Sequence, residues 1–190
     1  MVNIFEGRLV RLSAISAANW EVYYEWGLNT ESDRLLYQIP FPSSRDRVRT
    51  WVEEAARSHT PGENFDFQIE RLDGEMVGSI GVHHCNLRFG TFMYGLAILP
   101  QHQRKGYASE AIRLVLRYYF QERRYQKANT EVYSFNEPSI RLHEKLGFVQ
   151  EGRLRRTVFT QGRYFDRLQY GMTREEFEAR WPEWSLNPQE

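Results

Sequence analysis

The sequence predicts a single α/β domain of the α+β kind, in which helices flank one mixed and mostly antiparallel sheet. The chain has 190 residues, of which 41% are hydrophobic, and a chain of this size buries a core without disulfides or metal. Short alternating apolar runs lie on both sides of a long helical pattern at residues 106–122. The order of the elements combines hairpins with a strand–helix–strand crossover, which places antiparallel and parallel pairs in one sheet.

The first part of the chain predicts one strand and then two helices. Residues 7–12 form a short strand-like run, and residues 16–28 and 44–58 have helical periodicity. The second helix has one apolar stripe, made of Val48, Trp51, Val52, Ala55 and Ala56. Residues 29–43, between the two helices, are expected to form a loop.

Three strands are expected next. Apolar residues alternate over residues 65–69 and again over residues 76–85, and Asp73-Gly74 between them predicts a two-residue hairpin turn. A third strand is expected at residues 91–99, where Pro100 ends it.

The most regular helical pattern begins at Gly106 and continues to about Glu122. Its apolar stripe consists of Ala108, Ala111, Ile112, Val115, Leu116, Tyr119 and Phe120. A strand at residues 128–134 and a short helix at residues 138–146 follow, and Gly147 is expected to cap that helix.

The end of the chain predicts a hairpin and a final helix. Residues 148–158 and 163–172 are expected to be antiparallel strands joined at Gln161-Gly162. Thr173 and Glu176 form a capping box for a helix that reaches about Trp181. The domain is expected to span residues 1–182, with residues 183–190 as a tail.

Composition and charge disfavour several classes of protein. The chain has 25 basic and 25 acidic residues, so it lacks a global field for nucleic acid or for anionic lipid. Its single cysteine, Cys85, excludes a disulfide within the chain and favours a reducing compartment. No run approaches the roughly 20 apolar residues of a membrane span. We expect a soluble, cytoplasmic protein with no metal site and no membrane or nucleic-acid partner.

Arginines in the last hairpin are the strongest argument for nucleic-acid binding. They are Arg153, Arg155, Arg156 and Arg163. Because neighbouring side chains of a strand point to opposite faces, we expect them not to form one patch.

The loop before the long helix has the composition of an anion site. The first turn of a helix leaves backbone N–H groups without partners, and the helix dipole adds positive potential there. Gly106 has no Cβ to hold a phosphate away, while Arg104 and Lys105 add charge. The P-loop and the dinucleotide-binding glycine motif are absent, which leaves the pattern Q-x-x-G-x-A from Gln103 to Ala108. An ordinary glycine at a helix start is the alternative interpretation.

A second motif follows about thirty residues later. It consists of Asn136-Glu137-Pro138-Ser139 and then Glu144-Lys145-Leu146-Gly147-Phe148. The two motifs in this order resemble the GNAT superfamily of N-acetyltransferases, and more narrowly its RimJ/RimL-like branch. The resemblance runs from about Gly7 to Met172, and residues 151–164 also resemble the C-terminal strands of spermidine acetyltransferases.

The resemblance implies a sheet that is splayed in the middle and takes up acetyl-CoA as co-substrate. The strands at residues 91–99 and 128–134 would run in parallel on the two sides of the gap. The implied cofactor contacts are Leu96, Ala97, Ile98, Gln103, Arg104, Lys105, Gly106, Tyr107, Ala108, Asn136 and Ser139. The first three would pair with the pantetheine arm, residues 104–108 would bind the pyrophosphate, and the last two would lie near the sulfur. Helix capping is a second role for Asn136 and Ser139.

Acyl transfer to an amine needs a base, a donor for the oxyanion and a source of a proton for the leaving thiolate. By resemblance, the backbone N–H of Ala97 or Ile98 would be the oxyanion donor. In many relatives a tyrosine at this position acts as the general acid. His143 occupies the position here, so it is a candidate general acid. The candidates for the base are weak: Tyr94, His83, His84 and Glu70.

The resemblance implies an N-acetyltransferase in which a primary amine attacks acetyl-CoA directly in a ternary complex. The acceptor would be a protein N-terminal amine, a polyamine or another small amine, and a homodimer is a further expected assembly. A non-catalytic acetyl-CoA-binding sensor or assembly module of the same fold is the alternative. The expected acceptor rim is aromatic and acidic, with Tyr23, Tyr24, Trp26, Tyr37, Phe41, Phe159 and Tyr164 beside Glu25, Glu31 and Asp33.

Overall fold

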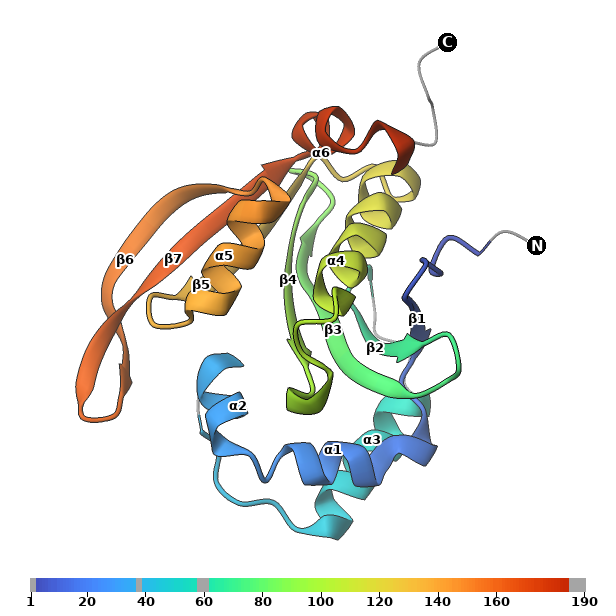
Figure 1. Cartoon of the computed structure of the whole chain (residues 1–190), viewed down its shortest axis with the longest axis vertical. Coiled ribbons are helices and arrows are strands. Elements are labelled where there is room, and N and C mark those ends of the chain that lie inside the picture. Colours follow the sequence, from blue (N-terminus) through green and yellow to red (C-terminus); the bar gives the residue numbers. More distant parts are fainter. Residues whose placement is uncertain (1–2, 37–38, 58–61, 185–190) are drawn as a thin grey trace. The chain divides into compact units, whose positions relative to one another are not determined.

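The computed structural model describes residues 3–36, 39–57 and 62–184, and Figure 1 shows its helices and strands. The backbone forms two compact units, the first made of Met1–Gly81 and Leu96–Ala111 and the second of Val82–Gly95 and Ile112–Glu190. Their boundaries fall within two strands and one helix, so these elements contribute to both units. Within the described part of the chain, no helix has the length and apolar character needed to cross a membrane.

Seven strands form one sheet, in the order β1-β2-β3-β4-β5-β7-β6. They are β1 (Val10–Ala14), β2 (Phe65–Arg71), β3 (Met76–Asn86), β4 (Thr91–Ile98), β5 (Lys127–Tyr133), β6 (Val149–Thr160) and β7 (Arg163–Thr173). β4 and β5 are parallel, whereas the pairs β1–β2, β5–β7 and β6–β7 are antiparallel. The predicted mixed α/β sheet is therefore confirmed.

The first unit contains a helix that the sequence interpretation missed. Its helices are η1 (Ala17–Asn19), α1 (Trp20–Trp26), α2 (Thr30–Leu36) and α3 (Arg45–Arg57). The expectation of a loop throughout residues 29–43 is wrong, because α2 lies within that range. The Asn29 side chain accepts a hydrogen bond from the Ser32 backbone N–H at 3.2 Å, as a helix cap does. None of the α2 residues is buried, so the helix lacks the apolar stripe that would have revealed it.

The turn between β2 and β3 has three residues instead of the predicted two. The Gly74 N–H donates to the Arg71 carbonyl at 2.9 Å, and the Arg71 N–H donates to the Glu75 carbonyl at 2.8 Å. Gly74 has a φ of 94°, as expected for a type I turn closed by a glycine bulge. Asp73-Gly74 marked the turn correctly but not its length.

The connection from β4 to the following helix has more parts than expected. β4 ends at Ile98, and a short 3₁₀ helix, η2 (Pro100–His102), follows. α4 begins at Tyr107 and not at Gly106, and it ends at Arg117. Gly106 has a φ of 86° and so lies outside the helix, although its carbonyl accepts the Glu110 N–H at 3.1 Å. A π-helical turn, η3 (Tyr118–Glu122), completes the expected helical segment.

The second unit has α5 (Glu137–Leu146), α6 (Arg174–Arg180) and the short η4 (Pro182–Trp184). Gly147 has a φ of 88° and ends α5, where the Phe148 N–H donates to the His143 carbonyl at 3.0 Å. Thr173 and Glu176 form the predicted capping box of α6. The core of this unit is an aromatic cluster of Phe92, Tyr119, Phe120, Tyr125 and Phe177.

The hairpin of β6 and β7 is long and curved (Figure 1). Gln161 and Gly162 have φ values of 52° and 74°, as the expected two-residue turn requires. Pairing between the strands shifts register between Leu154 and Val158, so β6 has extra residues there. The expectation that the hairpin arginines form no common patch is wrong in part, because Arg153, Arg155 and Arg156 line one hollow. An interrupted ladder no longer imposes the regular alternation of faces.

Candidate active site

The loop from Gln103 to Ala108 lies in the first unit and leads into α4. Arg104 and Gly106 both have positive φ values, 62° and 86°, so the chain turns tightly before α4. Among the residues that the structure describes, the backbone N–H groups of residues 104–108 donate to no protein acceptor. Such a run of amides at the start of a helix is suited to an anion. The side chains of Arg104 and Lys105 are exposed beside it.

Two contacts fix this loop to its own unit. The Gln103 side-chain N–H donates to the Ile98 carbonyl at 3.3 Å, which ties the loop to the end of β4. His102 is buried, and its Nε2 lies 3.3 Å from a Glu75 carboxylate oxygen. Gln103 therefore shapes the loop through its side chain, a role that the motif alone did not specify.

Glu110 fastens the first turn of α4 to the N-terminal segment. Its carboxylate accepts the backbone N–H groups of Arg8, Leu9 and Val10 at 2.9, 2.7 and 2.8 Å. The Glu110 side chain is 2% exposed. A Cβ on Gly106 would lie 3.2 Å from Leu9 Cδ1, so this segment also limits the size of residue 106. The start of α4 is thus held in place by a buried carboxylate.

The predicted pantetheine partners lie in β4, where it closely approaches β3. A Cβ on Gly78 would lie 2.3 Å from the Ala97 carbonyl oxygen, so only glycine allows this approach. The Leu99 N–H donates to the Val77 carbonyl at 2.9 Å. Leu96, Ala97 and Ile98 are all partly exposed. The segment is held by β3 and retains accessible surface.

In the second unit, the pairing of β4 with β5 changes character at Tyr94. The parallel backbone register covers Thr91–Met93 with Lys127–Asn129. At the next position the Thr130 side-chain hydroxyl donates to the Tyr94 carbonyl at 3.0 Å. The Thr130 side chain thus supplies the hydrogen bond that the backbone of a neighbouring strand would otherwise donate to this carbonyl. Where two strands of a sheet separate, their backbone groups need such substitute partners.

Asn136, Ser139 and His143 form one connected group at α5. The Asn136 side-chain oxygen accepts the Ser139 N–H at 3.2 Å, so the capping role of Asn136 is present. His143 Nδ1 lies 2.8 Å from the Ser139 carbonyl oxygen, which can only accept a hydrogen bond. Nδ1 therefore carries the proton, and Nε2 of the neutral ring carries a lone pair.

His143 is neutral at physiological pH. Its side chain is 2% exposed, and burial lowers its pKa to about 4, although the bond to Ser139 acts in the opposite direction. Nε2 is buried and has no hydrogen-bond partner among the described residues. A role as general acid therefore requires that the ring first takes up a proton.

Tyr94 lies next to His143, with ring centroids 6.0 Å apart. The Tyr94 hydroxyl is also buried, with no hydrogen-bond partner in the described part of the chain. Burial raises the pKa of this phenol well above its usual value, so Tyr94 holds its proton and is poorly suited to act as a base. The structure thus brings two candidate catalytic residues together, each with an unsatisfied polar atom.

The other predicted base and rim residues have varied surroundings. Glu70 pairs with Arg11 at 3.0 Å, and the rings of His83 and His84 are exposed with centroids 5.2 Å apart. Glu31 pairs with Arg34 at 3.0 Å. Tyr37 lies outside the described residues.

Sequence reasoning gave no structural role to Thr130 and Glu110, and it placed Asp33 on the acceptor rim without distinguishing it from Glu25 and Glu31. Thr130 is a buried polar residue on the apolar face of a strand, and Glu110 is a buried acid in the first turn of a helix. Both are patterns that mark a required hydrogen bond. Burial raises the pKa of Asp33, and its Oδ2 has no partner among the residues described. No signal in the sequence distinguished Asp33 from neighbouring acids.

Comparison with known proteins gives consistent results. Residues 10–149 match the acetyltransferase (GNAT) domain family. The SPbeta prophage-derived uncharacterized N-acetyltransferase YokL of Bacillus subtilis is 44% identical, over 93% of this chain and 97% of that protein. A spermidine N(1)-acetyltransferase of Vibrio cholerae is 31% identical, over 65% of this chain and 78% of that protein. A crystal structure of spermidine N-acetyltransferase from Vibrio cholerae, in complex with CoA and spermine, superposes with a TM-score of 0.78 at 22% identity, covering 89% of this chain and 98% of that one.

Proposed function

Because the chain belongs to the GNAT acetyltransferase family, we propose that it moves an acetyl group from acetyl-CoA to a primary amine by direct attack in a ternary complex. Acetyl-CoA is the acetyl donor of this family. The acceptor is a protein N-terminal amine, a polyamine or another small amine. A relative named as a spermidine acetyltransferase supports the polyamine.

The observation that carries the proposal is the run of amides at residues 104–108, which leads into the first turn of α4 and has no protein acceptor among the described residues. A diphosphate carries negative charge on several oxygens, each of which accepts hydrogen bonds from such amides. Gly106 at a φ of 86° leaves this backbone without a side chain in the way. We assign the pyrophosphate of acetyl-CoA to this loop.

The remaining roles follow from the chemistry of the thioester. The backbone of Leu96, Ala97 and Ile98 would pair with the pantetheine amides, and the N–H of Ala97 or Ile98 would donate to the developing oxyanion. Asn136 and Ser139 are assigned to the pantetheine arm near the sulfur.

His143 is assigned to proton transfer. When the amine attacks the thioester carbon, the new C–N bond leaves an ammonium that must lose a proton. When the C–S bond breaks, the thiolate must gain one. The lone pair on His143 Nε2 can accept the first proton and then give it to sulfur. The lowered pKa makes Nε2 a weak base but makes the protonated ring a ready donor to the thiolate.

The test of cofactor binding uses variants that differ in backbone strain. Gly106→Glu fills the loop with a carboxylate, but a side chain at this φ also strains the backbone. Ala108→Glu places the same charge in the first turn of α4, where a helix tolerates an acid well. Ala56→Glu, at an exposed position of α3, is the matched control. Acetyl-CoA binding is measured by titration calorimetry.

We expect both loop variants to lose measurable binding and Ala56→Glu to bind as the wild type does. Normal binding by Ala108→Glu would show that the diphosphate lies elsewhere. Release of free thiol from acetyl-CoA, measured with peptides, polyamines and aminoglycosides, then identifies the acceptor. Tight binding with no thiol released by any amine would contradict the catalytic proposal.

A further inference from the structure

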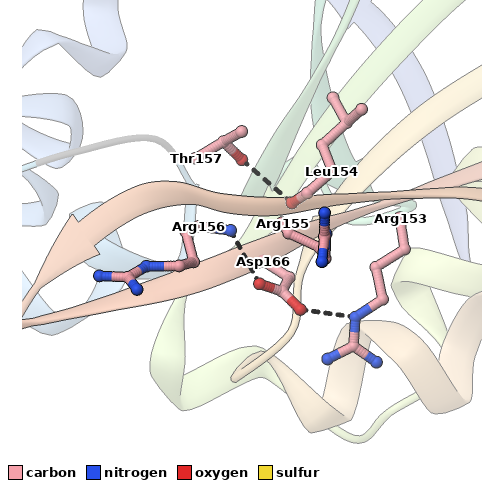
Figure 2. A pocket seen from close by; sticks show the side chains of 6 residues that line it. All are labelled: Arg153, Leu154, Arg155, Arg156, Thr157 and Asp166. Carbon is pink, nitrogen blue, oxygen red and sulfur yellow. Dashed lines mark hydrogen bonds and ion pairs between the residues drawn. The ribbon is translucent and has the colours of Figure 1, made fainter.

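The proposed acetyl transfer assigns no role to a concave surface on the β6–β7 hairpin. This surface is lined by Arg153, Leu154, Arg155, Arg156, Thr157 and Asp166, and we call it the hairpin hollow. Figure 2 shows that these residues come from the irregular part of β6 and from the facing position of β7. Its lining has three arginines and one aspartate, an excess of positive charge in a chain with no net charge.

The hollow exists because β6 departs from regular pairing. Leu154 pairs with Arg167 and Val158 pairs with Phe165, so three residues of β6 stand opposite Asp166 alone. Arg156, in this bulge, has a φ of 56°, which is unfavourable for a residue with a side chain. Bulges often redirect side chains at functional positions, and retained strain is a reason to look for a function.

Asp166 organises the hollow from within. One of its oxygens accepts the Arg156 backbone N–H at 2.8 Å, and the other accepts Nε of Arg153 at 2.5 Å. The same two bonds, in that order, lower the pKa of Asp166. The carboxylate is therefore ionised and already occupied, and it fixes the Arg153 side chain.

The Arg155 guanidinium is not held by Asp166 as Arg153 is. It acts electrostatically on Asp166, but within the described part of the chain no carboxylate lies at ion-pair distance from it. Arg153 uses Nε for Asp166, which leaves its terminal nitrogens available. Figure 2 shows the side chains of Arg153 and Arg155 on the Asp166 side of the hairpin, whereas Arg156 points away. The Arg156 guanidinium lies over the Tyr164 ring, 5.0 Å from its centroid.

We propose that the hairpin hollow binds an oxyanion, a carboxylate or a phosphate group, between the guanidinium groups of Arg153 and Arg155. Each planar guanidinium offers paired N–H donors that match two oxygens of such a group. Asp166 is a positioning residue that presents Arg153. Polyamines are cations, so this surface repels them and selects molecules that carry an acidic group. The proposal does not depend on where acetyl-CoA binds.

The test follows the arginine side chains directly. Protein labelled with ¹⁵N-arginine is titrated with inorganic phosphate or with acetate at constant ionic strength, with chloride as the reference, and the Nε–H signals are followed by NMR. Every titration is repeated in the Gly106→Glu background, so that phosphate at the loop before α4 contributes nothing. Arg155→Gln removes the free guanidinium at an exposed position, and Arg155→Lys keeps its charge without the fork. Arg141→Gln, on α5 and also exposed, is the matched control.

We expect saturable shifts of the Arg153 and Arg155 signals with phosphate, acetate or both, and the anion that saturates identifies the chemical class. Arg155→Gln should weaken binding about tenfold or more, as expected for the loss of a charge-assisted hydrogen bond, and Arg155→Lys should weaken it less. Arg141→Gln should bind as the wild type does. Shifts that grow linearly with either anion, or equal affinities in Arg155→Gln and Arg141→Gln, would overturn the proposal whatever the acetyl-CoA titrations show.

Discussion

The two ring nitrogens of His143 have different surroundings, and this difference controls the chemistry of the residue. Nδ1 donates to the Ser139 carbonyl at 2.8 Å, whereas Nε2 has no partner among the described residues. Charging the ring would place an unpaired N–H in a buried site, and for this reason burial lowers its pKa to about 4. A tyrosine at this position would carry its proton in the resting enzyme and could donate it directly. The neutral His143 must first accept a proton at Nε2.

His143 should make the free energy of unfolding depend on pH in mildly acidic solution. Between pH 6.5 and about pH 4 the unfolded chain protonates this imidazole and the folded chain does not. Stability therefore falls as pH falls through this window, by roughly 3 kcal/mol in total, and His143 adds no further loss below it. Urea denaturation from pH 4 to pH 8 measures the dependence. His143→Asn keeps a donor for Ser139 but does not titrate, so its stability should fall less steeply. Parallel pH profiles would contradict a neutral, buried His143.

Residue types and spacing predicted part of the candidate site. The glycine before α4 and the Asn136 cap needed only local patterns or a resemblance, whereas the contact of His143 with Tyr94 came from the structure. The protonation state of His143 depends on burial by Tyr94, Phe148 and Tyr170, which are distant in sequence. Burial of that kind is a property of the fold, so no local pattern contained it.

At the scale of elements, α4 depends on a contact that spans about a hundred residues of sequence. Glu110 in its first turn accepts the backbone N–H groups of Arg8, Leu9 and Val10. These donors belong to the first residue of β1 and the two residues before it, and they point at a single carboxylate. The start of α4, and with it the amides assigned to the diphosphate, is therefore anchored by the N-terminal segment.

Replacing Glu110 should destabilise the protein strongly. Glu110→Ala leaves these donors without an acceptor, and each buried unsatisfied group costs about 1–3 kcal/mol, so we expect a loss on the order of 4 kcal/mol. Glu110→Gln keeps one side-chain oxygen and should lose less. The midpoint of urea denaturation reports the change. Glu178→Ala, which breaks a partly exposed ion pair on α6, should change stability by less than about 1 kcal/mol. A similar small effect for Glu110→Ala would refute the anchoring role.

Elements with strong local signals were predicted well, and those without them were not. The turn at Gln161-Gly162 and the capping box of α6 follow from local backbone chemistry. α2 was missed because it buries no residue, and the β6 bulge was missed because it depends on pairing with β7. The helix at residues 106–122 was predicted as one element, but tertiary packing of Tyr119 and Phe120 accompanies its change to a π-helical turn at Tyr118.

At the scale of the whole molecule, a net charge of zero means that ligands are attracted by local groups and not by a global field. The loop at residues 104–108 and the hairpin hollow are both positive, and both are assigned to anions. Salt screens the attraction between exposed charges beyond about 10 Å, so these groups act only on a ligand that is already close. Affinity for acetyl-CoA should therefore depend mainly on the amides of the loop.

Acetyl-CoA should stabilise the folded protein as a whole. A ligand that binds only the folded state adds about 2.7 kcal/mol at a concentration one hundred times its Kd. For a chain of 190 residues, each kcal/mol raises Tm by about 2–4 °C, so we expect an increase of about 5–10 °C in a calorimetric scan. Ala108→Glu should melt at the wild-type temperature without ligand and show no increase with it, while Ala56→Glu should respond as the wild type does. Equal increases in all these proteins would mean that acetyl-CoA binds without the amides before α4, because a carboxylate in that turn would then leave binding intact.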